Sequence, residues 1–202
     1  GEFYTHTLMT PFFNPGPNPF GLPKIYVAAV GPLMTQAVSE SADGLLAHPF
    51  NSPKYINDVT LPIINKGLET TGKTRDQFDL SVSVMTGIGA TEETHQQAVK
   101  ACREQVAFYA STPNYKAVLE THGLGDLSEA LNKLSKQGQW KEMGEAIDDE
   151  TLKTFAVIEE TPEALAREIK NRYGTIGQRI APVLYSGDLD LAAKVLAALK
   201  TD

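Results

Sequence analysis

The sequence has almost no cysteine, no long hydrophobic run and no excess of basic charge, and each absence excludes a class of protein. One cysteine in 202 residues, Cys102, cannot form an internal disulfide; this fits a reducing compartment, and we expect a cytoplasmic location. No stretch approaches the roughly 18 consecutive apolar residues of a membrane span, so we expect no membrane partner. The 18 Lys and Arg against 25 Asp and Glu, a net charge of −7, argue against a nucleic-acid partner, because phosphate binding needs clustered cations.

The composition that remains is that of a folded globular chain. Hydrophobic residues make up 42% and charged residues 21% of the sequence, so there is enough apolar material to form a core. The length fits one domain, and we expect residues 1–202 to form it. Cys102 lies in a helical run, 98–103, which favours a small buried side chain over a nucleophile.

Strand and helix signals alternate along the chain after a proline-rich start. Residues 11–23 carry prolines too close together for a helix or a central strand, and we expect an extended connector whose aromatic side chains cover the body of the domain. Thr91 and Thr161 mark two helix starts. The predicted strands are 24–30, 45–50, 78–86 and 178–185, with 155–159 as an apolar link. The main predicted helices are 33–42, 55–71 with a kink or break at Pro62, 91–109, 161–173 and 188–200.

This alternation of strands and helices predicts an α/β fold. Parallel strands joined by right-handed helical crossovers form one sheet. A complete (β/α)8 barrel has eight such strands, twice the number predicted here. We therefore expect a partial TIM barrel, about half of one, with a helical insertion over residues 111–150.

The stretch most informative about ligands is the strand, turn and helix start at residues 27–33. Ala28, Ala29 and Gly31 are small enough to let a ligand approach the backbone, and Pro32 is pre-organised for a first helical position. The amides that open a helix carry partial positive charge, which suits a phosphate or the edge of a flavin-like ring. The alternative is steric: a tight turn between strand and helix requires glycine whether or not a ligand binds.

The same stretch carries a resemblance to a known family. Segments 24–32 (KIYVAAVGP) and 39–44 (SESADG) resemble the luciferase-like monooxygenase superfamily, and most of all its branch of F420-dependent oxidoreductases. The similarity runs from Gly1 to about Arg179. Further segments that look like this branch are 46–50 (LAHPF), 108–115 (FYASTPNY), 120–123 (ETHG), 134–140 (LSKQGQW) and 147–150 (IDDE).

The resemblance implies a fold, a cofactor and a set of contact residues. The family's fold is a (β/α)8 barrel with a helical insertion, and the match places this chain at strands 5 to 8. The implied activity is hydride transfer between coenzyme F420 and a small organic substrate. By the same match, the residues that contact the cofactor are Ala28, Ala29, Val30, Gly31 and Pro32. Two alternatives stay open: an FMN-dependent monooxygenase, and a non-catalytic half-barrel that associates with itself.

The resemblance also shows what this sequence lacks. In the family, the first four strands supply the acid and base residues near the deazaflavin, and no corresponding sequence is present. We therefore expect this chain to be part of something longer and to lack the catalytic residues on its own. Barrel active sites draw on the ends of several strands, so we expect either a complementing N-terminal half-barrel or a homo-oligomer.

Three histidines have interpretations from their positions. His48 follows a predicted strand at its carboxyl end, where it either lines a pocket and transfers a proton or makes a structural hydrogen bond before Pro49. His122 is interpreted as a helix-terminal cap, and His95 as solvated surface. No two histidines have metal-ligand spacing, so we expect no metal site.

Aromatic and glycine-rich segments complete the candidates. Phe108, Tyr109, Tyr115 and Trp140 flank the insertion and either cover a substrate pocket or form the insertion's own small core. The glycines of 87–90 do not support a dinucleotide-binding loop, because a third glycine and a later acidic residue are missing. The acidic run 148–150 is interpreted as a helix cap. The sequence pattern does not identify the substrate.

Overall fold

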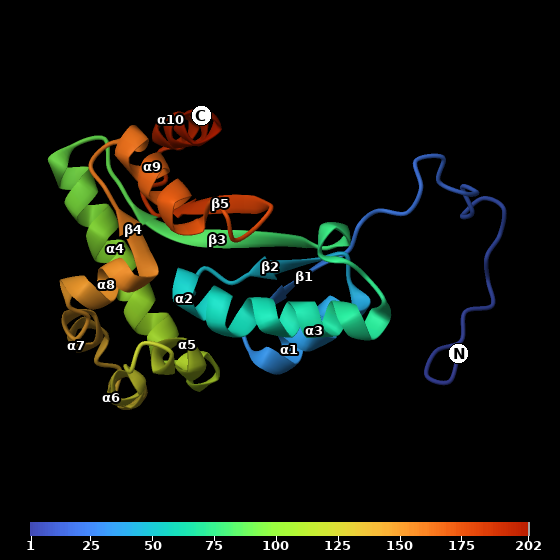
Figure 1. Ribbon diagram of the computed structural model, residues 1–202, viewed down its shortest axis with the longest axis horizontal. Coiled ribbons are helices and arrows are strands. Elements are labelled where there is room, and N and C mark those ends of the chain that lie inside the picture. The colour runs from blue at the N-terminus through green and yellow to red at the C-terminus, as the bar shows by residue number, and fades with distance from the viewer. Residues whose placement is uncertain (202) are drawn as a thin grey trace.

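The computed structural model describes residues 1–201, and these fall into two parts of different kind. Residues 1–25 contain no helix or strand and extend away from the rest of the chain (Figure 1). From Tyr26 onward, parallel strands alternate with helices in a single α/β unit.

Five parallel strands form one sheet in the described residues. They are β1 (Tyr26–Ala29), β2 (Gly44–Ala47), β3 (Asp79–Gly87), β4 (Ala156–Ile158) and β5 (Arg179–Leu184). The order is β1-β2-β3-β4, and β5 also pairs with β3. Because β5 pairs along 81–86, both β2, at 79–82, and β4, at 85–87, pair with the opposite edge of β3. The four predicted strands are confirmed, but the interpretation of 155–159 as a link was wrong, because residues 156–158 pair with the end of β3.

Most of the predicted helices are confirmed, and their starts follow the N-cap rule. Thr91, Asp148, Thr161 and Asp188 each accept a hydrogen bond from a backbone N–H of the helix that they precede. The helices are α1 (Pro32–Ser41), α2 (Pro53–Tyr55), α3 (Leu61–Thr71), α4 (Glu92–Ala110), α5 (Lys116–Glu120), α6 (Gly125–Lys136), α7 (Trp140–Glu145), α8 (Asp149–Phe155), α9 (Pro162–Tyr173) and α10 (Leu189–Lys200). A π-helical turn (Ile56–Thr60) joins α2 to α3 just before Pro62, so the predicted helix over 55–71 is interrupted.

Helices cover one face of the sheet. Leu45, Leu80 and Val82 are fully buried in a core with side chains of α1, α3, α9 and α10. Alternate residues of a strand point to opposite faces, and on the other face Ala28 and Leu46 remain exposed. A second core joins the end of β3 to the group of α4–α8, which lies at the end of the molecule away from residues 1–25 (Figure 1). The helices of residues 111–150 therefore pack in a core that they share with α4 and the end of β3.

The proline-rich segment behaves differently from the expectation. Its aromatic side chains do not cover the domain: Phe12 is 89% exposed and Phe20 94% exposed. The hydrogen bonds of this segment are local, such as Phe13 N–H to Thr10 O, so nothing in the described chain holds it against the sheet.

None of the helices within residues 1–201 has the length and hydrophobicity to cross a membrane.

Candidate functional site

The carboxyl ends of the parallel strands bring the sequence-predicted residues to one edge of the sheet. The turn after β1 and His48 after β2 lie next to each other, because β1 and β2 pair in register and the His48 N–H donates to Ala29 O at 3.4 Å. In open and closed parallel α/β sheets, ligands bind at this edge. The edge is therefore the candidate site.

The turn leaves the amino end of α1 open. Gly31 is the N-cap of α1 and offers no side chain to the helix, and the first turn contains no acidic residue. Pro32 has no N–H, and the N–H groups of Leu33 and Met34 make no hydrogen bond within the described residues. The first turn thus presents two free backbone donors at the positive end of the helix dipole.

Gly31 is not required by the turn itself. Its φ is −80° and its ψ is 160°, a conformation that any residue adopts. A Cβ atom added at Gly31 would meet no atom of residues 1–201 within 4 Å. The steric explanation for this glycine was therefore wrong, and the space beside it is open to a ligand.

His48 is held by its neighbours in a defined orientation. Its Nδ1 accepts a hydrogen bond from the Phe50 N–H at 3.1 Å, which confirms the structural hydrogen bond. The ring packs edge-on against Tyr109, with centroids 4.6 Å apart, and in a tilted arrangement against Tyr115, with centroids 4.9 Å apart. Burial lowers the pKa of His48, so the neutral ring is favoured at neutral pH. A role in a ligand pocket stays a prediction.

Tyr55 and Asn51 complete this edge, and the sequence pattern did not predict either of them as a site residue. The Tyr55 hydroxyl donates to Val30 O at 3.1 Å and so helps to fix the backbone of the turn. The Asn51 amide donates to His48 O at 2.5 Å and to Ser83 O at 2.9 Å. The available signal was Ser52-Pro53, an N-cap followed by proline at the first helical position, which places the helix start two residues before 55.

The other two histidines that were interpreted from the sequence, His122 and His95, differ from those interpretations. The His122 Nε2 lies 2.7 Å from Ser52 Oγ, so its side chain joins the insertion to the start of α2 instead of capping its own helix. Burial lowers the pKa of His122. His95 is half-buried and its Nδ1 has no partner within residues 1–201, which does not fit solvated surface.

Cys102 is confirmed as a buried, unreactive side chain. It is fully buried, and its Sγ donates to Thr86 O at 3.2 Å. Burial raises the pKa of the thiol to about 12, so almost no thiolate exists near neutral pH. Within the described residues, no group of three or more His, Cys, Asp or Glu side chains is placed to hold a metal ion.

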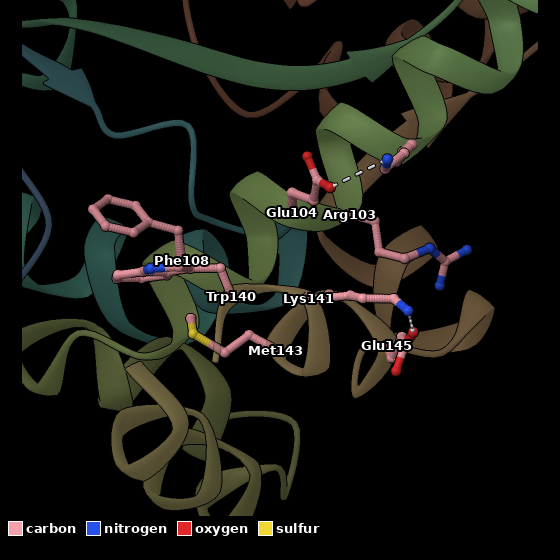
Figure 2. Close-up of a pocket in the computed structure, with 9 residues that line it drawn as sticks. Arg103, Glu104, Phe108, Trp140, Lys141, Met143 and Glu145 are labelled. Carbon is pink, nitrogen blue, oxygen red and sulfur yellow. Dashed lines mark ion pairs between the residues drawn. The ribbon is translucent and has the colours of Figure 1, made fainter. Parts of the chain in front are cut away.

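The four aromatic residues in and beside the insertion divide between two places. Tyr109 and Tyr115 pack beside His48 and Phe50 at the candidate site. Phe108 of α4 and Trp140 of α7, both about half exposed, lie together at one end of a groove between these helices (Figure 2). The groove has a volume of about 570 Å³, and none of its lining residues in the described chain belongs to the strand ends. The four side chains therefore neither all cover one substrate pocket nor all form a small core of the insertion.

The family comparison matches most of the chain. Residues 1–179 match the family model described as "Luciferase-like monooxygenase". An uncharacterized protein of Mycobacterium tuberculosis is 44% identical over 183 residues, which cover 91% of this chain and 54% of the relative. A 5,10-methylenetetrahydromethanopterin reductase of Archaeoglobus fulgidus is 32% identical over 163 residues, covering 78% of this chain and 45% of the relative. The chain thus spans about half the length of these relatives.

Two solved structures share the fold. The coenzyme F420 dependent tetrahydromethanopterin reductase from Methanopyrus kandleri aligns with a TM-score of 0.67 at 22% identity, covering 88% of this chain and 50% of that structure. An F420-dependent secondary alcohol dehydrogenase, in complex with an F420-acetone adduct, aligns with a TM-score of 0.59 at 15% identity, covering 87% of this chain and 48% of that structure. The predicted partial barrel is confirmed at the level of the fold, since the chain corresponds to about half of a barrel-type reductase.

Proposed function

Because the chain belongs to the luciferase-like monooxygenase family, we propose that it is the C-terminal half of an oxidoreductase that transfers hydride between coenzyme F420 and a small organic substrate. In this proposal, Ala28, Ala29, Val30, Gly31 and Pro32 form the cofactor contact. The name of one relative, an F420-dependent glucose-6-phosphate dehydrogenase of Nakamurella multipartita that is 27% identical over 121 residues, supports the choice of cofactor, and so do the names of the two solved structures.

The observation that carries the proposal is the open space at Gly31. The turn does not need glycine for its own conformation, and a side chain there would occupy the space beside the free amides of α1. A ligand that lies against the backbone and places an anionic or carbonyl oxygen on those amides explains both features. When bound, the deazaflavin supplies the hydride chemistry.

The residues of this chain then bind and orient. The Leu33 and Met34 amides hold the anionic part of the ligand, and Tyr55 fixes the turn through Val30 O. His48 lies next to the turn as a neutral ring. No acid or base for the transfer is assigned within this chain, because in our proposal those groups lie on the other half of the barrel.

Titration of the chain with F420 and, in parallel, with FMN tests the cofactor. We expect saturable quenching of F420 fluorescence and binding of FMN that is weaker by about tenfold or more. Tighter binding of FMN, together with oxygen consumption by the reduced flavin, would favour a flavin-dependent monooxygenase instead. Absence of binding with both cofactors, even with the remaining half of a relative added, would contradict the proposal.

We also propose that a second half-barrel covers the open side of the sheet. The outer edges of β1 and β5 pair with no strand of the described chain, and Ile25 and Leu46, 60% and 41% exposed, lie at or beside the uncovered face. Unpaired edges with apolar neighbours favour association. The twofold length of the relatives favours a complementing half of four parallel strands as the occupant.

Light scattering of the chain, alone and mixed with the preceding half of the Mycobacterium tuberculosis relative, tests this partner. We expect a one-to-one complex in the mixture. A tight homodimer that does not exchange with the added half would show that a second copy is the occupant, and a stable monomer under both conditions would contradict the proposal.

A further inference from the structure

The contacts of His48 determine which of its ring nitrogens carries the proton. The Phe50 backbone N–H can only donate, so Nδ1, 3.1 Å away, must accept with its lone pair. In a neutral imidazole the proton then resides on Nε2. The structure therefore assigns the Nε2–H tautomer to His48.

The ring of His48 is held so that this donor has a fixed direction. Tyr109 of α4 and Tyr115 at the start of the insertion both pack against it, with ring centroids 4.6 and 4.9 Å from that of His48. Asn51 holds the backbone, since its amide bridges His48 O and Ser83 O. These contacts come from separate elements, so the orientation does not depend on one flexible loop.

The donor itself is unused within the chain. Nε2 has no hydrogen-bond partner in residues 1–201, and it is not among the polar atoms that are sealed from solvent. His48 and residues Ala29 and Val30 of the turn line one void of about 10 Å³, so the His48 side chain packs directly beside the turn. A fixed, unpaired donor next to an open turn is a feature of a binding site rather than of a core.

We infer that His48 donates a hydrogen bond from Nε2 to an acceptor oxygen, carbonyl or anionic, of the ligand that occupies the 28–32 turn. This inference rests on the proposed function for the identity of the ligand, but not for the tautomer. It also excludes His48 as a proton-abstracting base, because Nε2 already carries a proton and Nδ1 is occupied by the Phe50 N–H. His48 is thus a binding residue.

The first test needs no ligand. Nitrogen-15 NMR of the histidine-labelled chain distinguishes the two neutral tautomers, and the His48→Gln variant assigns the signal. We expect a protonated Nε2 and an unprotonated Nδ1 at neutral pH. A protonated Nδ1 would overturn the inference, whatever the outcome of the cofactor experiments.

The second test measures F420 binding to two variants, each of which keeps an amide group near the position of only one of the two ring nitrogens. In His48→Gln the side-chain amide lies near the position of Nε2 and retains a donor, whereas in His48→Asn it lies near Nδ1 and the donor is lost. We expect binding about tenfold weaker for His48→Asn and only a few-fold weaker for His48→Gln. The matched control is His6→Asn, in the exposed leading segment, with no change expected.

The outcomes separate the two proposals. Equal F420 affinities of wild type, His48→Asn and His48→Gln would overturn the inference and leave the proposed function standing. Absence of F420 binding to the unsubstituted chain, with the complementing half present, would overturn the proposed function and the ligand part of this inference together.

Discussion

Replacing Gly31 with aspartate is expected to stabilise the fold and to weaken cofactor binding at the same time. Gly31 is the N-cap of α1, has the extended conformation of a capping residue and offers no side chain. An aspartate there would accept a hydrogen bond from the first turn and would place negative charge at the positive end of the helix. Together these effects are expected to raise the unfolding free energy by about 0.5–1 kcal/mol.

The same carboxylate would occupy the site that we assign to the ligand. It would lie within about 4 Å of a bound anionic oxygen, and repulsion at an intermediate effective dielectric is worth several kcal/mol before screening by salt. We expect F420 binding to weaken by about 100-fold. The Gly31→Asn variant is the matched control, because asparagine caps the helix without the charge and should weaken binding less. Unchanged binding in Gly31→Asp would contradict the placement of the ligand.

Replacing Gly89 with alanine is expected to be strongly destabilising. Gly89 follows β3, and a Cβ added there would lie 2.1 Å from His95 N and 2.3 Å from the Thr94 carbonyl carbon. Both are backbone atoms of the first turn of α4, so the clash cannot be relieved by rotating a side chain. We expect the unfolding free energy to fall by about 3 kcal/mol and Tm to fall by about 10 °C.

The Gly31→Ala variant is the control for this second prediction. The same substitution at Gly31 meets no atom of the part of the chain that the structure describes and needs no unusual backbone angle, so stability is expected to stay constant or to rise by up to about 1 kcal/mol. Urea unfolding of both variants measures the difference. Equal stabilities would mean that β3 and α4 are not packed as described here, and that the two glycines do not have separate roles.

The sequence predicted the regular elements well where local chemistry determines them. Thr91 and Thr161 have side chains that bond to their own helices, and the strand at 24–30 is a run of apolar residues, so these signals are local. The strand over 156–158 is three residues long and exists because β2 ends early and leaves the edge of β3 free at Met85. Pairing of 156–158 with β3 therefore depends on the tertiary arrangement and cannot be predicted from the sequence of this segment alone.

The site was predictable only in part, for the same reason. The small residues at 28–32 were identified from their type, and the open helix end confirms that the turn is accessible. The contact of His48 with Tyr109 and Tyr115 joins residues more than 60 positions apart, and no pattern in the sequence connects them. The prediction that Phe12 and Phe20 cover the body of the domain was wrong, because an aromatic side chain is buried only where another surface packs against it.

The central claim is that the free amides of α1 face the cofactor, and backbone amide NMR shifts on addition of F420 test it most directly. The account predicts that the amide signals of Leu33 and Met34 shift, while those of the first turn of α9, which Thr161 already caps, stay in place. Shifts that spare α1 and gather instead on α4 and α7, around Phe108 and Trp140, would contradict it.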